Sequence, residues 1–452
     1  LMPDGVGIRN YIYTDVFDDL NQNLTLLHNF KQNTLENLGL SNAQFSIEKL
    51  THYKETPREK FLRELIHLSR LKYNSKQENN LSILSNYMPK KNSLKLKLFY
   101  GTVELFSKFY NEQHQIKKLE IKYDKAIRQS KVYKFYLNYF RTKGFSLIFC
   151  THQRAVIAAP IFAAAKDAGL KTSTAIYSWD NLPKARLALR ADEYFVWSPH
   201  MKNELQTFYP ELKDEQIKIV GTPQFEFHYD KSYLWSKEKF ADYYDLDVNK
   251  KWLCFSGDDK TTSPFDQDYL KDIAEVIKNS ELSNQWQILL RPVPVEGFEK
   301  YQNVINQYPQ IIKKTGAVWK LTSHWSDVYP EQKDLNILTS LCEHADAVVN
   351  VGSTMAIDFG MHNKPAIYIN YDANPNSKWS IRRVYQFQHF RTMKGLGPII
   401  WLSSPSELID ILKNLNEYHN KTKTDMEKWC EIIIPKHLRT KSSQLIQKEL
   451  LK

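Results

Sequence analysis

The sequence predicts an α/β protein made of two halves, each built around a parallel sheet covered by helices. Three observations support this fold class. The chain has 452 residues, which is enough for two domains of about 200 residues each. Its contents of 42% hydrophobic and 25% charged residues are those of globular proteins. In both halves, short apolar runs typical of buried strands alternate with stretches of helical spacing.

The clearest element lies at 345–372. The β-branched run at 347–351 predicts a strand covered on both faces. A Gly-Ser-Thr turn follows at 352–354, then a short helix at 355–361 and a second buried strand at 366–369. Backbone N–H groups, hydroxyls and a helix N-terminus meet at this turn, which predicts an anion site. An ordinary capped turn has the same local pattern, so the pattern alone does not decide between the two.

The composition of the chain argues against several classes of protein. The four cysteines lie far apart and form no C-x-x-C pair, which argues against a zinc knuckle and suits a reducing cytoplasm. No apolar run reaches the ~18 residues that a membrane span needs, and no signal peptide opens the chain. We therefore expect a cytoplasmic protein, either soluble or peripheral on the inner face of the cell membrane.

The net charge of +11 is concentrated in the segment 86–145, which has 14 Lys and Arg, 4 Asp and Glu, and 13 aromatic residues. One interpretation is an interfacial helix on anionic lipid, because such helices place a basic face beside an apolar one. Another is a basic helical insertion whose lysines are solvated and whose aromatic residues form its core. Nucleic acid is a third, but no recognisable binding motif accompanies the charge, and we expect no nucleic-acid partner.

The first half opens on a Gly-x-Gly turn at 5–7, which only two apolar residues precede. Either a strand is completed by residues before Leu1, or the chain starts at this loop. The loop is interpreted as facing a ligand, with Asp4 as a base, or as a capped N-terminal turn. Buried strands follow, and we place them at 145–150, 171–177, 193–197 and 217–220. Ligands bind beyond the carboxyl ends of such parallel strands, where the sequence has His152, Trp179, Asp180 and Asn181.

The second half follows an aromatic and charged crossover at 227–250. Its first strand ends at Ser256 and Gly257, and its second ends at Arg291. The predicted organisation is an N-terminal acceptor domain at 1–226, a C-terminal donor domain at 251–430 and a terminal segment at 431–452 whose helix packs back on the first domain.

Three segments resemble those of known transferases. GSTMAIDFGMHNKPAI at 352–367 resembles the donor-binding segment of bacterial GT-B glycosyltransferases, in which a Gly/Ser turn meets the diphosphate and an acidic helix residue, here Asp358, holds the ribose. VGTPQFEF at 220–227 resembles the junction in CDP-glycerol glycerophosphotransferase-like and surface-polysaccharide proteins, and IYSWDNL at 176–182 is similar to that group. The resemblance covers the whole chain in architecture but only these segments in sequence.

The resemblance implies two Rossmann-like domains facing a cleft, with a nucleotide-sugar donor and a cell-surface glycan or glycolipid acceptor, as in lipopolysaccharide or capsule biosynthesis. Arg291 would neutralise charge on the leaving diphosphate, with a surface ion pair as its alternative. The implied donor-binding residues are Arg291, Gly352, Ser353, Thr354, Asp358, Ser256 and Gly257. The implied acceptor-binding residues are Gly5, Gly7, Arg9, Trp179 and Asn181. The nucleotide-sugar is a substrate, so no cofactor is expected.

One departure from the GT-B pattern bears on stereochemistry. Many retaining enzymes carry two glutamates eight positions apart, and the corresponding positions here are Asn350 and Asp358. The missing pair favours inversion, which needs one general base to deprotonate the acceptor hydroxyl. Asp4 is our first candidate, because the first loop faces the cleft in this fold. His152 is the second and Asp180 the third, although Asp180 also suits a role in orienting the acceptor beside the ring of Trp179.

Metal need not take part, and we predict no metal site. The D-x-D strings at 245–247 and 266–268 lie in the crossover and at a helix start. Three other classes stay open. A glycerol- or ribitol-phosphate transferase shares the junction motif. A sugar-nucleotide 2-epimerase shares the fold, but its cleft carboxylates cannot be placed here. A non-catalytic binder of lipid surfaces would explain the basic segment and leave the Gly-Ser-Thr turn without a role.

Overall fold

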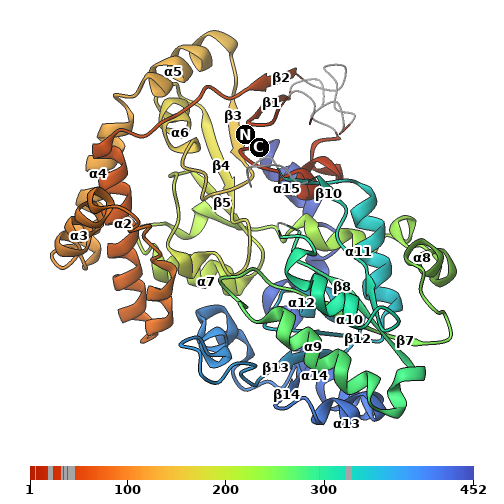
Figure 1. Cartoon of the computed structure of the whole chain (residues 1–452). Coiled ribbons are helices and arrows are strands. Elements are labelled where there is room, and N and C mark those ends of the chain that lie inside the picture. The colour runs from red at the N-terminus through yellow and green to blue at the C-terminus, as the bar shows by residue number, and fades with distance from the viewer. Residues whose placement is uncertain are drawn as a thin grey trace. The chain divides into compact units, whose positions relative to one another are not determined.

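The computed structural model describes residues 1–5, 7–18, 24–31, 34, 38, 46–294, 296–320 and 328–452. These residues divide into two compact units (Figure 1): unit 1 contains Leu1–Thr222 and Lys441–Lys452, and unit 2 contains Pro223–Thr440. Each unit holds parallel strands together with helices, so the predicted α/β class is confirmed. The predicted domain boundaries, the cleft and the status of 86–145 as an insertion stay predictions.

Unit 2 is built on a parallel sheet of six strands in the order β14-β13-β12-β7-β8-β9. The strands are β7 (Lys251–Ser256), β8 (Trp286–Arg291), β9 (Ile312–Lys314), β12 (Ala347–Asn350), β13 (Ala366–Ile369) and β14 (Ile400–Leu402). Taken in chain order, this is the 3-2-1-4-5-6 arrangement of the Rossmann fold. The strand order reverses between β7 and β12, which pair with Phe255 opposite Val349. Crossovers on either side of this point run in opposite directions and leave a crevice there.

The helices of unit 2 follow from apolar spacing and from close packing. They are α8 (Lys237–Tyr244), α9 (Asp266–Lys278), α10 (Gln302–Gln307), α11 (Lys333–His344), α12 (Met355–Met361), α13 (Glu407–Lys413) and α14 (Leu415–Ile433). In α9, Leu270, Ile273 and Ile277 form a fully buried stripe at helical spacing. Gly360 lets α12 approach α14, because a Cβ at this position would lie 2.9 Å from Cys430 Sγ.

Unit 1 has a parallel sheet of four strands and a separate pair. The strands are β3 (Leu147–Cys150), β4 (Lys171–Ala175), β5 (Glu193–Val196) and β6 (Ile217–Ile219), with β1 (Thr25–His28) paired to β2 (Ser46–Lys49). The first two residues join the two sheets. Met2 N–H donates to Leu27 O at 2.8 Å, and Thr151 N–H donates to Leu1 O at 3.1 Å. Met2 also forms a parallel bridge with His28. Residues 1–2 therefore lie between β1 and β3, where the strand order of unit 1 reverses.

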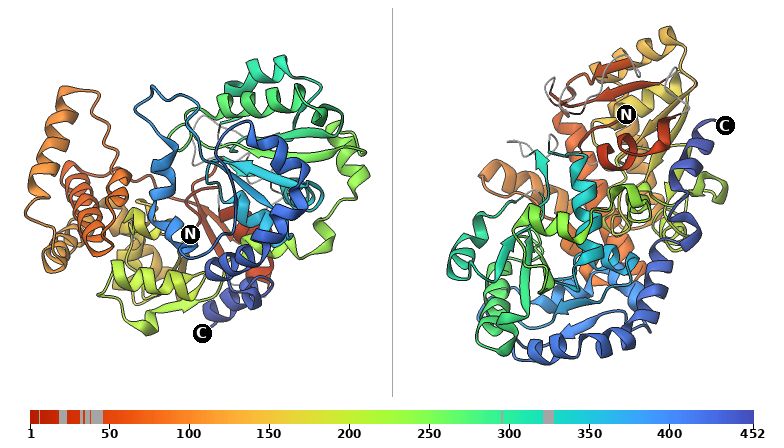
Figure 2. Two further views of the ribbon diagram at one scale, coloured as in Figure 1. Left: turned by 90° about the horizontal axis from the view of Figure 1, so that it is seen from below. Right: turned by 90° about the vertical axis from the view of Figure 1, so that its right-hand side faces the viewer.

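The helices of unit 1 are α2 (Pro57–Gln77), α3 (Leu94–Phe106), α4 (Gln113–Ile127), α5 (Lys131–Lys143), α6 (Ala158–Asp167), α7 (Pro199–Phe208) and α15 (Ser442–Leu450). A reciprocal capping box between Thr56 and Glu59 starts α2, with Pro57 at its first position. Leu65 of α2 and Leu119 of α4 belong to one buried cluster. Helices α2 and α3, coloured orange, stand to the outside of the strands of this unit (Figures 1 and 2).

The segment 86–145 forms α3, α4 and α5, and these helices differ in what they expose. The aromatic residues Tyr136 and Phe140 of α5 are buried at 2% and 4% exposure, as expected for a packed subdomain. Helix α3 instead exposes Leu94, Leu98 and Leu105 by 53–75%. Of the described residues, no helix is long and apolar enough to cross a membrane.

Several elements differ from their predicted positions. Strands β1, β9 and β14 were not predicted. A single π-helical turn, η1 (Ile8–Ile12), follows the opening loop. The terminal helix begins at Ser442, and the residues before Lys441 belong to unit 2. A short antiparallel pair joins β10 (Trp319–Lys320) to β11 (Tyr329–Pro330).

Candidate functional site

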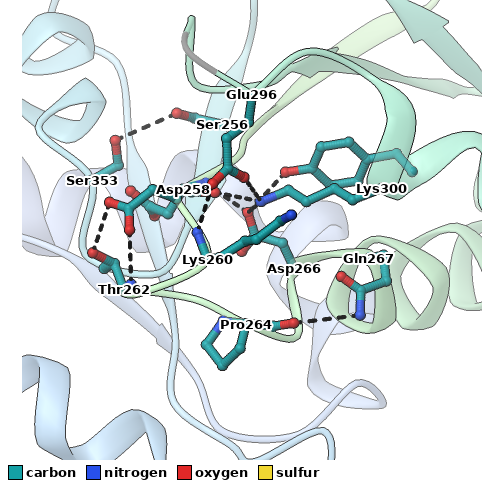
Figure 3. Close-up of polar contacts among 12 residues, drawn as sticks. Ser256, Asp258, Lys260, Thr262, Pro264, Asp266, Gln267, Glu296, Lys300 and Ser353 are labelled. Atoms are coloured by element: carbon teal, nitrogen blue, oxygen red, sulfur yellow. Dashed lines mark hydrogen bonds and ion pairs between the residues drawn. The ribbon is translucent and has the colours of Figure 1, made fainter. Parts of the chain in front are cut away.

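Two serine hydroxyls meet at the point where the strand order of unit 2 reverses. Ser256 ends β7, and Ser353 lies in the turn after β12. The Ser256 hydroxyl donates to Ser353 Oγ at 3.5 Å (Figure 3). Ligands of open α/β sheets bind at this place, beyond the carboxyl ends of the strands. The predicted donor residues at 256–257 and 352–354 are therefore neighbours in space.

Gly352 is required by the shape of the turn after β12. Its φ is +74°, in the left-handed region that favours glycine. A Cβ here would lie 2.8 Å from Phe390 Cζ and 3.2 Å from Val384 Cγ1. These two residues belong to the short helices η11 (Ile381–Gln386) and η12 (Gln388–Met393). Glycine is thus demanded by backbone conformation and by packing, whether or not a ligand binds.

Asn350 supports the turn from the end of β12 and is fully buried. Its Oδ1 accepts a hydrogen bond from Ser353 N–H at 2.8 Å, while its Nδ2 has no partner among the described residues. Helix α12 has only seven residues, so its dipole adds little to anion binding here. The capacity of the turn to hold an anion rests on the hydroxyls of Ser256, Ser353 and Thr354 rather than on the helix N-terminus.

A cluster of charged side chains follows β7 directly (Figure 3). Asp266, the first residue of α9, accepts from Asp258 N–H at 2.6 Å and from Tyr301 OH at 2.8 Å. Lys300 Nζ lies 3.3 Å from Asp266 Oδ2 and 3.1 Å from Glu296 Oε2, and it also donates to the Asp258 carbonyl. These contacts hold the loop after β7 in one position beside the paired serines.

Burial raises the pKa of Asp258 well above its ordinary value, and the nearby Asp266 carboxylate raises it further. The pKa of Asp266 is also raised by burial, with Lys300 acting in the opposite direction. Gly257 has no room for a side chain, because a Cβ would lie 2.0 Å from Tyr301 OH. The sequence placed Asp258 at a strand end without giving it a role. Its signal was two consecutive acidic residues after a buried strand.

Arg291 and Asp358, both predicted to bind the donor, are engaged with other side chains. Arg291 Nη2 lies 3.1 Å from Asp334 Oδ1, and both residues are buried, so this ion pair is not on the surface. Asp334 also accepts from Trp319 Nε1 at 2.8 Å. Because a carboxylate already balances Arg291, its charge is only partly available to a diphosphate. Its predicted role stays a prediction.

Asp358 belongs to a chain of side chains that starts at the end of η6 (Pro223–His228). Asp358 Oδ1 lies 3.1 Å from His228 Nε2, and His228 Nδ1 lies 2.9 Å from His362 Nε2. His362 Nδ1 lies 2.7 Å from Glu343 Oε2. Burial lowers the pKa of His362 to about 4, and the charge of His228 lowers it further. Helices η6 and α12 thus meet in space through His228 and Asp358, and the ribose role of Asp358 stays a prediction.

In unit 1, Asp4 and His152 meet where the strand order reverses. Asp4 follows the bridge at Met2, and His152 follows β3. His152 Nδ1 lies 2.5 Å from Asp4 Oδ2, and both side chains are buried, at 7% and 2% exposure. His152 Nε2 has no hydrogen-bond partner among the described residues. An imidazole with a carboxylate on Nδ1 and an unpartnered Nε2 has the hydrogen-bonding arrangement of a general base, and here this Nε2 is buried from solvent.

The loop around Asp4 packs tightly on the end of β3. A Cβ at Gly7 would lie 2.8 Å from Thr151 Oγ1, so the second glycine of the predicted turn permits this approach. Gly5 O accepts from Ile8 N–H at 3.2 Å, and Arg9 lies on η1. The acceptor-binding roles of these residues stay predictions.

The remaining predicted residues lie in the loop after β4 and have structural contacts. Asp180 accepts from Ser178 Oγ at 2.6 Å and forms an ion pair with Lys184, so its carboxylate is poorly placed to act as a base. Trp179 is 4% exposed, and its ring lies in the core rather than on a surface. Asn181 Oδ1 accepts from Arg154 Nη1 at 3.2 Å, which ties this loop to the loop after β3.

In the part of the chain that the structure describes, no group of three or more His, Cys, Asp or Glu side chains is arranged to hold a metal ion. The first D-x-D string has Asp245 paired with Lys313 at 2.6 Å. The second begins with Asp266, which belongs to the cluster after β7.

No protein-family model matches this chain, and no curated protein matches it. Similar solved structures include the wall teichoic acid polymerase TagF, with 14% identity over 68% of this chain and 74% of that one and a TM-score of 0.44. A glycosyltransferase from Rickettsia africae has 11% identity over 71% and 80% of the two chains, with a TM-score of 0.41. The UDP-GlcNAc 2-epimerase of Neisseria meningitidis has 10% identity over 95% and 100%, with a TM-score of 0.45. At these values, the likenesses do not assign the chain to a family.

Proposed function

We propose that the protein is a GT-B glycosyltransferase that moves a sugar from a nucleotide-activated donor to an acceptor hydroxyl with inversion. One observation carries the proposal: each unit places its chemically competent side chains where its own strand order reverses. Unit 2 has the hydroxyls of Ser256 and Ser353 there, and unit 1 has the Asp4–His152 pair. The resemblance at 352–367 supports the same division into a donor unit and an acceptor unit.

In this mechanism, His152 Nε2 takes the proton from the acceptor hydroxyl as its oxygen attacks the anomeric carbon. The bond between that carbon and the diphosphate oxygen breaks, and its electron pair leaves with the nucleoside diphosphate. Asp4 holds the Nδ1–H of His152, orients the ring and stabilises the imidazolium that forms. The sequence favoured Asp4 as the base. This proposal instead assigns that role to His152, and the contact of 2.5 Å between His152 Nδ1 and Asp4 Oδ2 supports Asp4 as its positioning residue.

The donor diphosphate would be held by the hydroxyls of Ser256, Ser353 and Thr354. A hydrogen bond to a charged group contributes roughly 1.5–3 kcal/mol, so these groups are strong enough to matter for donor affinity. The raised pKa of Asp258 keeps its carboxyl protonated to higher pH than a free aspartate, which limits repulsion of an anion at this point.

The direct test measures thermal stabilisation of the whole chain by UDP-, GDP-, CDP- and CMP-linked donors. At a free concentration of 100 times Kd, a bound donor stabilises the folded state by about 2.7 kcal/mol. We expect stabilisation by one donor class and a smaller stabilisation in Ser353→Ala, with Ser377→Ala as an unrelated serine control. No stabilisation by any nucleotide would refute the proposal. Transfer of glycerol or ribitol phosphate from a CDP-linked donor, or epimerisation of a UDP-sugar without an acceptor, would replace glycosyl transfer by the corresponding class.

We also propose that α3 attaches the protein to an anionic membrane surface. Leu94, Leu98 and Leu105 lie on one exposed face of this helix, and Lys95 and Lys97 are exposed between them. Apolar side chains that enter the interface, with lysines beside them, match the chemistry of an anionic lipid surface.

A further inference from the structure

Unit 1 contains a cavity of about 510 Å³ beside the loop that carries His152. Its walls come from α2, α4 and α6 and from the loops after β3 and β4. The volume is within the range of ligand pockets, about 300–1,000 Å³. No predicted site residue lines this cavity, and the mechanism above does not use it.

The lining divides into an apolar part and a basic part. Aliphatic and aromatic side chains form most of the wall, among them Ile66, Ile121, Val156, Phe162 and Leu187. Seven basic and three acidic side chains complete the lining. A cavity of this kind fits a molecule that has a hydrocarbon part and an anionic part.

At one end of the cavity, the charges balance. Arg190 Nη2 forms ion pairs with Glu120 and with Glu211, the latter at 3.2 Å. Arg70, from behind the wall, lies 2.7 Å from the same Glu120 carboxylate. Two arginines and two glutamates thus neutralise one another, and this end has no surplus charge to attract a ligand.

At the other end, two arginines form no direct ion pair among the described residues, although the charge of Asp180 acts on Arg154 and that of Glu64 acts on Arg186. Arg154 makes its hydrogen bond to the neutral amide of Asn181, and no ion pair or hydrogen bond to Arg186 occurs among the described residues. The neighbouring Arg63 is already neutralised by Glu55, at 2.7 Å, and by Glu64. Among the basic residues of the lining, Arg154, Arg186 and Lys117 therefore form no ion pair with the described residues, and Arg154 and Arg186 are close enough to repel one another.

The titration of the neighbouring groups agrees with a surplus of positive charge here. Desolvation lowers the pKa of Arg186, whose side chain still reaches solvent, and the charge of Arg154 lowers it further, while Glu64 acts in the opposite direction. Burial also lowers the pKa of His67 to about 3, with Arg186 as the next cause. His67 Nε2 lies 3.1 Å from Lys184 O, which fixes the neutral ring with this nitrogen as donor. An anion at this end would relieve the positive potential that all three groups experience.

We propose that this cavity binds a phosphorylated hydrocarbon chain, with the phosphate on Arg154 and Arg186 and the chain along the apolar wall toward Ile121. A guanidinium group can bind a phosphate with two parallel hydrogen bonds, which makes arginine well suited to recognise a phosphate group. Ile121 is 49% exposed, so the apolar wall reaches the surface on α4. Resting on the proposed function, this ligand is the lipid part of the acceptor, and its remaining part extends along the loop at 152–154 to His152.

Binding of decyl phosphate to the full chain, measured by calorimetry below the micelle concentration, tests the proposal. We expect decyl phosphate to bind at least ten times more tightly than inorganic phosphate or 1-decanol. The double variant Arg154→Gln/Arg186→Gln should lose at least tenfold in affinity for decyl phosphate and nothing for decanol. Ile121→Asp should weaken decyl phosphate and leave inorganic phosphate unchanged. Lys118→Gln is the matched control, because Lys118 is an exposed lysine of α4 outside the cavity.

Equal binding of decyl phosphate and inorganic phosphate, or full binding by the double arginine variant, would overturn the proposal. Vesicles of phosphatidylglycerol form a second arm. If the double arginine variant no longer binds the vesicles but still binds decyl phosphate, the two arginines contact the membrane surface rather than a ligand in the cavity, and the proposal fails. Thermal stabilisation by the donor, measured on the same samples, separates the two proposals. If the protein responds to a nucleotide donor but does not bind decyl phosphate, only the proposal for the cavity is refuted.

Discussion

His152 Nδ1 lies 2.5 Å from Asp4 Oδ2, although the two residues are 148 positions apart in the sequence. The carboxylate therefore selects the tautomer that leaves Nε2 without a proton, and Nε2 is the atom without a partner among the described residues. This relationship gives the two residues different tasks, a base and the group that orients it.

The first prediction concerns this pair. His152→Ala should lower kcat by about 10²–10⁴-fold, because proton transfer by a positioned side chain contributes that much. Asp4→Asn should cause a loss of similar order, and the double variant should be no worse than His152→Ala alone, because the two act as one unit. Steady-state kinetics with a saturating donor measure these values. Donor stabilisation of unit 2 should be unchanged, which excludes unfolding, and Asp180→Asn should lose much less activity. Full activity in both single variants would remove His152 and Asp4 from the mechanism.

The second prediction separates the turn of unit 2 into its shape and its hydroxyls. Ser353→Ala should raise the donor Kd by roughly tenfold, equivalent to about 1.4 kcal/mol, without a change in the melting temperature. Gly352→Ala should instead destabilise unit 2 by about 1–3 kcal/mol, because it forces a strained φ and meets Phe390. Calorimetric titration and thermal unfolding distinguish the two effects. An unchanged donor affinity in Ser353→Ala combined with Ser256→Ala would show that the donor lies elsewhere.

The third prediction concerns pH and stability. Burial, together with the charges of Glu78 and Asp180, raises the pKa of Glu204 on α7 from 4.5 to about 8. Because the folded-state pKa is the higher one, the stability that Glu204 contributes is complete below pH 4.5 and is lost as the pH rises to about 8. The resulting decrease in the free energy of unfolding is at most about 5 kcal/mol.

Glu204→Gln should therefore be more stable than the parent at pH 8, and the difference should shrink toward pH 5. Denaturant unfolding at several pH values measures this trend. Glu215→Gln is the control, because the Glu215 side chain is 70% exposed. A constant difference across the pH range would show that Glu204 ionises normally in the folded protein.

The fourth prediction tests the attachment of α3 to membranes. Leu98→Glu should reduce flotation with anionic liposomes, because it places a charge at the centre of the exposed apolar face. Raising the salt concentration should release the parent protein, since each lysine near an anionic surface contributes on the order of 1 kcal/mol. Leu451→Glu is a matched control, because Leu451 directly follows the terminal helix α15 and is 59% exposed. Equal flotation of parent and Leu98→Glu would exclude α3 as the contact.

Local sequence pattern was sufficient where the chain forms long apolar runs with a clear break. The strand, turn, helix and strand at 347–369 were predicted within one residue, because β-branched runs flank a turn that contains glycine. Strands β9 and β14 have three residues each, too few for a periodic signal. Strand β1 has four residues, again too few for a periodic signal.

The candidate site was predictable in its location but not in its partners. Residues after strand ends pointed to Asp4, His152 and Ser353, because parallel sheets bind ligands there. Which side chain neutralises which depends on contacts between distant segments. Arg291 is bound to Asp334, 43 residues away, and no property of its strand indicated this. The sequence did not indicate the arginines of the cavity for the same reason. Whether an arginine forms an ion pair can be judged only when all its neighbours in space are known.

Asn350 determines how the turn of unit 2 would hold an anion. By taking Ser353 N–H, it removes a fixed amide from the donors that face the crevice. Rotating hydroxyls remain, and an O–H group can follow an oxygen that shifts its position, whereas an amide cannot. Hydroxyl donors of this kind would accommodate diphosphates that bind in slightly different positions. The choice among nucleotides and sugars would then depend on contacts to the base and to the sugar ring, and donor preference could change in evolution while this turn stayed the same.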